Sequence, residues 1–356
     1  MNMGLITKKN ALILLALLAS FAIVQVLRSA NIITSYYEIT IATACINVIL
    51  ATSLNLITGF TGQFSLGHAG FMSIGAYTCG IMLIENPTPA GFLAGLFLGG
   101  IIAAIVGILI GIPTLRLKGD YLAIATLGFS EIIRVLFTNF QTITNGAVGF
   151  KGIPPVVNLW WSLGIMALVI VFILRLMRTS YGRALKAIRD DEVAAESMGI
   201  SLFKHKMYAF VLSGFIAGLG GGLIASIVGS INPLQFRFTL AYEILLIVVL
   251  GGMGSVSGTV VAAFVITAAK EWLRWLDNGF SLGLVKVPAI SGLRMVVFSV
   301  LLMLVILFYR QGLSGGKEFS WQALIGFPGK LYGKVAGGVK RLLPSSDTKR
   351  KGGEKP

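Results

Sequence analysis

Long runs of apolar residues, separated by short polar segments, set the pattern of this chain. A helix needs about 20 predominantly apolar residues to cross the hydrocarbon layer of a membrane. Eight runs approach or reach this length and are predicted as full crossings, at residues 11–27, 39–58, 64–84, 92–112, 121–138, 156–174, 207–229 and 289–309. The pattern predicts an all-α polytopic membrane protein.

A further apolar run, residues 241–269, carries a cluster of glycines. Gly251, Gly252, Gly254 and Gly258 fall within eight residues, and glycine is costly inside a helix. The run is therefore predicted to break there, either as a re-entrant hairpin, which we favour, or as two half-crossings. With the eight full crossings, about 8–10 membrane-inserted segments are expected.

The positive charges orient these helices. If the broken run enters and leaves on one side, one side of the membrane carries 21 of the 29 Lys and Arg residues. The segments on this side are residues 1–10, 59–63, 113–120, 175–206 and 310–356. Basic loops mark the cytoplasmic side of a membrane. Both termini are therefore predicted to be cytoplasmic.

The composition agrees with a membrane location. Of the 356 residues, 56% are hydrophobic and only 12% are charged, whereas soluble domains carry about 25% charged residues. The net charge of +15 would suggest nucleic acid as the partner of a soluble protein. Here the basic residues lie in loops beside apolar runs, so membrane lipid is the expected partner and nucleic acid is not.

Few residues offer the chemistry that enzymes or metal sites use. Cys45 and Cys79 lie in apolar runs without paired spacing, and the sequence has two histidines, His68 and His205. This set predicts no disulfide framework, no metal site and no catalytic residues.

Small residues recur at every fourth position in two predicted helices. One row is Gly91, Gly95, Gly99, Ala103, Gly107 and Gly111, and the other is Gly214, Gly218, Gly222 and Ser226. In lipid, where the hydrophobic effect does not drive helices together, small residues allow close backbone approach. The rows predict tight helix packing.

The polar segment 175–206 is predicted to carry a short capped helix on the cytoplasmic side. Asp190 or Asp191 suits the N-cap of a helix over residues 192–198, and Gly199 suits the C′ position that ends it. Such a helix is either a docking element for a soluble partner or a solvated loop helix.

Polar residues within the predicted spans indicate a candidate solute path. Broken, glycine-rich helices at membrane depth often line such paths. The candidate path residues are Asn55, Gln63, Ser65, His68, Gly251, Gly252 and Gly254. Alternatively, Gln63 and His68 satisfy buried backbone groups.

Charged residues also fall within the membrane-inserted runs. Glu131 and Arg134 can pair along one helix face because they are three residues apart. The pair is either functional, as ionisable residues in spans often are, or structural. Glu243, at the start of the broken run, has no evident local partner.

Five ordered motifs resemble the permease subunits of branched-chain amino acid ABC importers, the LivM-type family. They lie at residues 55–77, 114–127, 182–200, 251–258 and 309–313. The resemblance extends over residues 40–315, and the basic tail from Ser314 onward departs from the family pattern.

The resemblance implies a permease subunit in a bacterial inner membrane, paired with a second, LivH-like permease subunit. Two ATP-binding subunits and an extracytoplasmic solute-binding protein would complete the importer. The resemblance also assigns the ATPase-coupling residues, which would be Arg183, Glu192, Ala194, Ala195, Glu196 and Gly199.

The chain lacks a G-x-x-x-x-G-K-[ST] phosphate-binding loop, since Lys317 precedes Glu318 and Lys330 precedes Leu331. No cofactor is therefore expected on this chain, ATP and Mg²⁺ are expected on the partner subunits, and the chain is not expected to be an enzyme.

Two domains are expected: a transmembrane permease domain, residues 1–316, which includes the coupling loop 175–206, and a basic amphipathic or disordered cytoplasmic tail, residues 317–356. The solute implied by the resemblance is a branched-chain or other apolar amino acid. The alternatives are a related importer of urea or short amides and, less favoured, a stand-alone secondary transporter.

Overall fold

The computed structural model describes residues 34–278, 280–282, 285–287, 292–293, 296–300 and 303. The predicted span 11–27, most of the span 289–309 and the tail 317–356 lie outside these residues. The α-helices are α2 (Ser35–Thr58), α3 (His68–Glu85), α4 (Pro89–Thr114), α5 (Asp120–Asn139), α6 (Gln141–Thr144), α7 (Leu159–Leu176), α8 (Ser180–Asp190), α9 (Glu192–Ser197), α10 (Leu202–Val228), α11 (Phe238–Gly251) and α12 (Val256–Trp272).

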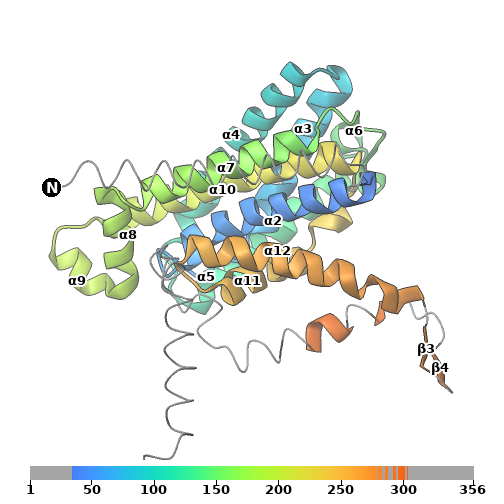
Figure 1. Ribbon diagram of the computed structural model, residues 1–356. Helices are drawn as coiled ribbons and strands as arrows, with labels where there is room; N and C mark the ends of the chain where they lie inside the picture. Colours follow the sequence, from blue (N-terminus) through green and yellow to red (C-terminus); the bar gives the residue numbers. More distant parts are fainter. Residues whose placement is uncertain are drawn as a thin grey trace, which may run out of the picture. The chain divides into compact units, whose positions relative to one another are not determined.

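Long apolar helices dominate the described part of the chain (Figure 1). Within it, α2, α4, α5, α7 and α10 are long and apolar enough to cross a membrane. The molecule is an all-α polytopic membrane protein, as the apolar runs predict.

Short 3₁₀ helices and strands connect the long helices. They are η1 (Gly146–Val148), η2 (Pro233–Phe236), η3 (Leu273–Asn278), β1 (Phe150–Lys151), β2 (Ser230–Ile231), β3 (Phe280–Leu282) and β4 (Val285–Val287). β1 pairs antiparallel with β2, with Phe150 opposite Ile231, and β3 pairs antiparallel with β4. The first pair ties the segment before α7 to the segment after α10.

Helices α3, α4 and α10 pack against one another through glycines. A Cβ added at Gly75 of α3 would lie 2.0 Å from the Gly218 carbonyl oxygen of α10, and one at Gly99 of α4 would lie 3.0 Å from the Gly75 Cα. These separations leave no room for a side chain. The two rows of small residues therefore pack helices tightly, as predicted.

We expect Gly75→Ala to lower the thermal stability of the detergent-solubilised protein by about 1–3 kcal/mol, because overpacking forces the α3 and α10 backbones apart. Gly164→Ala on α7 is the matched control, since a Cβ at Gly164 meets no atom within 4 Å. Thermal unfolding followed by tryptophan fluorescence measures both. Equal melting temperatures for the two variants would contradict the packing described here.

The predicted break in the run 241–269 is confirmed. α11 ends at Gly251 and α12 begins at Val256, and Gly252 and Gly254 between them have φ values of 99° and 83°. Glycine adopts this left-handed region without the steric cost that other residues incur.

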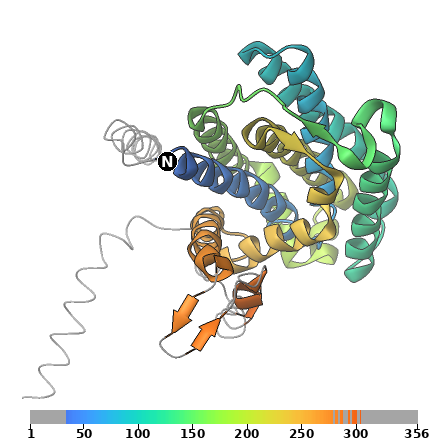
Figure 2. The same ribbon diagram turned by 90° about the vertical axis from the view of Figure 1, so that its right-hand side faces the viewer.

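α12 lies antiparallel to α2 along most of its length. Asn55 near the end of α2 bonds to Thr259, Asn47 bonds to Thr267, and Tyr36 at its start accepts a hydrogen bond from Arg274 just after α12. α11 is foreshortened in Figure 1 and seen lengthwise in Figure 2, so its axis is inclined to those of its neighbours. α12 and η3 therefore run beside α2 from its C-terminal to its N-terminal end.

The third predicted span begins later than its apolar run. Residues 64–67 are not helical, and α3 starts at His68. Gly62 has a φ of 71°, and the Leu66 N–H donates to the Thr126 hydroxyl of α5 at 3.0 Å. The Leu66 N–H is thus satisfied by α5, and the chain packs against α5 before it turns into α3.

Candidate functional site

α8 and α9 lie together at one end of the helix bundle (Figure 1). α9 is capped at both ends. The Asp191 carboxylate accepts hydrogen bonds from the N–H groups of Val193 and Ala194 at 2.9 and 3.0 Å. At the other end Gly199 has a φ of 82°, with hydrogen bonds from Gly199 N to Glu196 O and from Ile200 N to Ala195 O.

This C-terminal pattern is a Schellman motif. Asp191 is the N-cap, one of the two residues predicted for it. The two caps hold a helix of only six residues in one conformation, although so short a helix would be marginal in isolation.

The exposed apolar surface of α9 comes from two large side chains. Ala195 is only 3% exposed and faces the neighbouring helices, whereas Val193 and Met198 are 75% and 83% exposed. Ala194 and Glu196 are also exposed. Ala195, one of the predicted coupling residues, therefore does not lie on the exposed surface of α9, and sequence reasoning missed Val193 and Met198.

Contacts with α10 fix the orientation of α9. The Lys206 ammonium of α10 lies 2.5 Å from a Glu192 carboxylate oxygen. Nearby, the Tyr181 hydroxyl of α8 donates to the His205 carbonyl at 2.8 Å, and burial raises the pKa of Tyr181, so this donor stays protonated. Glu192 therefore holds α9 in place through an internal ion pair.

Arg189 links α8 to the end of α2. Its Nη1 donates to the Gly59 carbonyl at 3.2 Å, while Nε and Nη2 donate to Asp190. A Cβ added at Gly254 would lie 2.8 Å from Arg189 Nη1, so the guanidinium also borders the α11–α12 turn. Arg183, predicted as a coupling residue, is exposed and donates to the Arg178 carbonyl.

Asn55 joins α2 to the same turn. Its side-chain amide donates to the Ser255 carbonyl at 3.0 Å and to the Thr259 hydroxyl at 2.9 Å, and its carbonyl accepts from the Gly254 N–H at 2.9 Å. Asn55 is fully buried. The structure thus brings together Asn55, Gly252 and Gly254 of the candidate path residues. The Asn55 side chain connects α2 to the α11–α12 turn.

The other candidate path residues are buried. Gln63, Ser65 and His68 are 3%, 1% and 1% exposed. Ser65 accepts a 3.4 Å hydrogen bond from the Gly67 N–H, whereas the side chains of Gln63 and His68 have no hydrogen-bond partner among the described residues. Gly251 packs against Thr259 within the broken pair, where an added Cβ would lie 2.6 Å from the Thr259 Cα.

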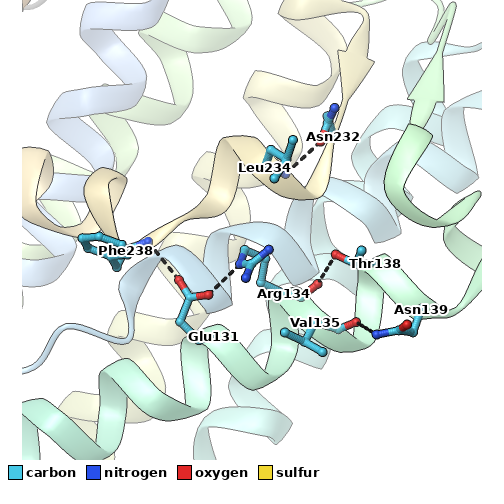
Figure 3. A network of polar contacts seen from close by, with 8 residues as sticks. All are labelled: Glu131, Arg134, Val135, Thr138, Asn139, Asn232, Leu234 and Phe238. Carbon is cyan, nitrogen blue, oxygen red and sulfur yellow. Dashed lines mark hydrogen bonds and ion pairs between the residues drawn. The ribbon is translucent and has the colours of Figure 1, made fainter.

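Ion pairs hold the charged side chains of α5 and of the α11–α12 pair. Arg134 Nε and Glu131 Oε2 of α5 are 2.6 Å apart, and Glu131 Oε1 accepts from the Phe238 N–H at the start of α11 (Figure 3). Lys270 of α12 lies 2.6 Å from Glu243 of α11. Glu243 has no local partner in the sequence, and its partner is the distant Lys270, because the break in the run brings α12 onto α11.

The described residues hold no group of three or more His, Cys, Asp or Glu side chains that could bind a metal ion. Cys45 and Cys79 are both buried and free. At the end of the bundle the structure builds an exposed capped helix, with polar links from α8 and α9 to α2, α10 and the α11–α12 turn.

The sequence of this chain matches a known family of transport proteins. The family described as branched-chain amino acid transport system / permease component matches residues 36–308. The high-affinity branched-chain amino acid transport system permease protein LivM of Salmonella typhimurium is 36% identical over 263 residues, which cover 64% of this chain and 61% of that protein. The chain thus aligns with 61% of the length of this relative.

More distant relatives share the same region. The probable branched-chain amino acid transport permease protein LivM of Methanocaldococcus jannaschii is 26% identical over 74% of this chain and 89% of its own. The ribose import permease protein RbsC of Haemophilus influenzae is 30% identical over 65% of this chain and 77% of its own. The chain belongs to the branched-chain amino acid transport system permease family.

Proposed function

We propose that this chain is a permease subunit of an ATP-driven importer of branched-chain or other apolar amino acids. Family membership supports a transport role, and α9 supports ATP-driven coupling. The observation that carries the proposal is a doubly capped helix that presents Val193 and Met198, 75% and 83% exposed, at one end of the bundle.

α9 suits docking to a groove on a soluble protein. Exposed apolar side chains on a rigid helix are typical anchors of helix-in-groove recognition. The proposed occupant of this surface is an ATP-binding subunit. A second ATP-binding subunit would dock on a second, LivH-like permease subunit. ATP and Mg²⁺ would bind to the ATP-binding subunits, and an extracytoplasmic binding protein would deliver the solute.

Arg189 offers a route from the docking helix into the membrane part. Movement of α8 and α9 would shift the guanidinium that bonds to the Gly59 carbonyl and borders Gly254. Asn55 ties α2 to the same turn. A push on α9 would therefore reach α2, α11 and α12 together.

The proposed topology places residues 175–206 and both termini in the cytoplasm of a bacterium, with the chain in the inner membrane. Because α12 runs beside α2 from Asn55 to Tyr36, we favour two crossings over a shallow hairpin for the broken run. Residues 1–316 would form the permease domain, and residues 317–356 a basic tail on the inner membrane surface.

A second candidate is import of a different polar solute by the same mechanism. Similarity to a ribose permease and, at 27% identity, to the autoinducer 2 import system permease protein LsrC of Yersinia enterocolitica favours it. A secondary transporter coupled through an intramembrane carboxylate is less favoured, because Glu131 and Glu243 are each held in an ion pair.

Reconstitution in liposomes tests the proposed function. We expect leucine uptake to require the ATP-binding subunits and ATP, because no phosphate-binding loop occurs in this chain. Uptake by the permease subunits alone, driven by an ion gradient, would contradict the proposal. Uptake of ribose in place of leucine by the complete complex would support the second candidate.

A further inference from the structure

We infer that the junction between α5 and the start of α11 binds the ammonium and carboxylate groups of an amino acid zwitterion during transport. The inference rests on the proposed function and assigns a solute-contacting site to it. Glu131 and Arg134 of α5 and the backbone N–H of Phe238 form the polar part of this junction (Figure 3).

The polar groups of the junction lie at membrane depth. Glu131 follows Asp120, the first residue of α5, by eleven positions, which is about 16 Å along a helix. Both oxygens of its carboxylate are engaged, one by Arg134 Nε at 2.6 Å and the other by the Phe238 N–H at 3.1 Å. Within the described residues, the hydrogen bonds of the Arg134 guanidinium use Nε alone, so other N–H groups remain to donate.

The Glu131–Arg134 ion pair is partly exposed at the surface of the chain. The side chains of Arg134 and Glu131 are 21% and 26% exposed. Ionisable groups at membrane depth are costly to expose to lipid and usually face protein or a water-filled path. This surface of α5 therefore faces away from lipid in the assembled importer.

Open space lies one turn before the pair along α5. Gly128 precedes Glu131 by three residues, and a Cβ added there meets no atom within 4 Å. The side chain of Phe238, whose N–H bonds to Glu131, is exposed at the same junction. The surroundings thus combine two charges, open space along α5 and the exposed aromatic side chain of Phe238.

A zwitterion matches these groups. Its ammonium pairs with the Glu131 carboxylate, and its carboxylate pairs with Arg134 and with the N-terminus of α11, where the helix dipole favours an anion. Because the solute brings one charge of each sign, both protein charges keep an opposite partner while the solute is bound. No net charge is added to the membrane interior.

Leucine uptake by the reconstituted importer tests the site. We expect Glu131→Gln and Arg134→Gln each to lower the uptake rate by at least about tenfold, the loss expected when a charged hydrogen-bond partner is removed. The matched controls are Glu271→Gln and Arg274→Gln, which remove another i,i+3 pair. We expect these controls to change uptake by less than about twofold.

Filling the open space tests the same site without touching a charge. We expect Gly128→Leu to lower leucine uptake by about tenfold or more, because the larger side chain occupies the space one turn before the pair. Gly164→Leu, at a glycine that is equally open, should leave uptake within about twofold. This comparison keeps the test decisive if the charge variants fail to fold.

Two results would overturn the inference. One is wild-type leucine uptake in Glu131→Gln, Arg134→Gln and Gly128→Leu. The other is loss of the second permease subunit on purification of these variants, which would make the junction a subunit contact. If the wild-type complex itself does not transport leucine, the proposed function fails first.

Discussion

The double substitution Val193→Asp plus Met198→Asp is expected to abolish ATP-driven transport while leaving the permease folded and in the membrane. Val193 of α9 and Met198, its C-cap residue, have large exposed apolar side chains. Carboxylates at both positions would have to be buried without partners in an apolar groove. We expect the affinity for the ATP-binding subunits to fall about 100-fold or more, measured by co-purification and by leucine uptake.

The matched control for this prediction is Val261→Asp plus Val265→Asp on α12, which introduces the same charges at exposed valines outside α9. The folded fraction of the control variant should still co-purify with the ATP-binding subunits. Normal co-purification and uptake of the α9 variant would show that the ATP-binding subunits dock elsewhere.

Loss of the Asn55 side chain is expected to be the most destabilising polar change in the described part of the chain. Asn55→Ala removes three hydrogen bonds and leaves the buried Gly254 N–H without its acceptor. An unsatisfied buried donor costs about 1–3 kcal/mol, and the lost bonds add to this. We expect a loss of about 2–4 kcal/mol and a fall in transport.

Asn47→Ala provides a matched control on the same helix, because Asn47 makes a single hydrogen bond to Thr267. We expect Asn47→Ala to lower the free energy of unfolding by less than about 1.5 kcal/mol. Thermal unfolding in detergent, read by tryptophan fluorescence, compares the two variants. An equal loss of stability in both variants would show that the three Asn55 hydrogen bonds stabilise the fold no more than a single hydrogen bond between helices.

Features encoded by neighbouring residues could be predicted from the sequence. The caps of α9 depend on Asp191 and Gly199, whose side-chain oxygen and missing Cβ act within a few positions. The break before α12 follows equally directly from clustered glycines. The apolar runs that became α2, α4, α5, α7 and α10 end within a few residues of the helices.

Contacts between distant residues could not be predicted in the same way. Glu243 finds Lys270 only because α12 folds back onto α11, and Arg189 reaches Gly59 across 130 positions. The outward face of α9 depends on which side packs against α8 and α10, so Ala195 turned inward while Val193 and Met198 turned outward. These outcomes depend on tertiary packing, which a periodic pattern does not specify.

We propose that α9 lies on the cytoplasmic side and is covered by ATP-binding subunits. Labelling of Val193→Cys with a membrane-impermeant maleimide tests it most directly, because Cys45 and Cys79 are buried and should react little. We predict labelling in inverted membrane vesicles but not in intact cells, and protection when the ATP-binding subunits are present. Labelling in intact cells, or labelling of inverted vesicles that the ATP-binding subunits do not reduce, would contradict the account.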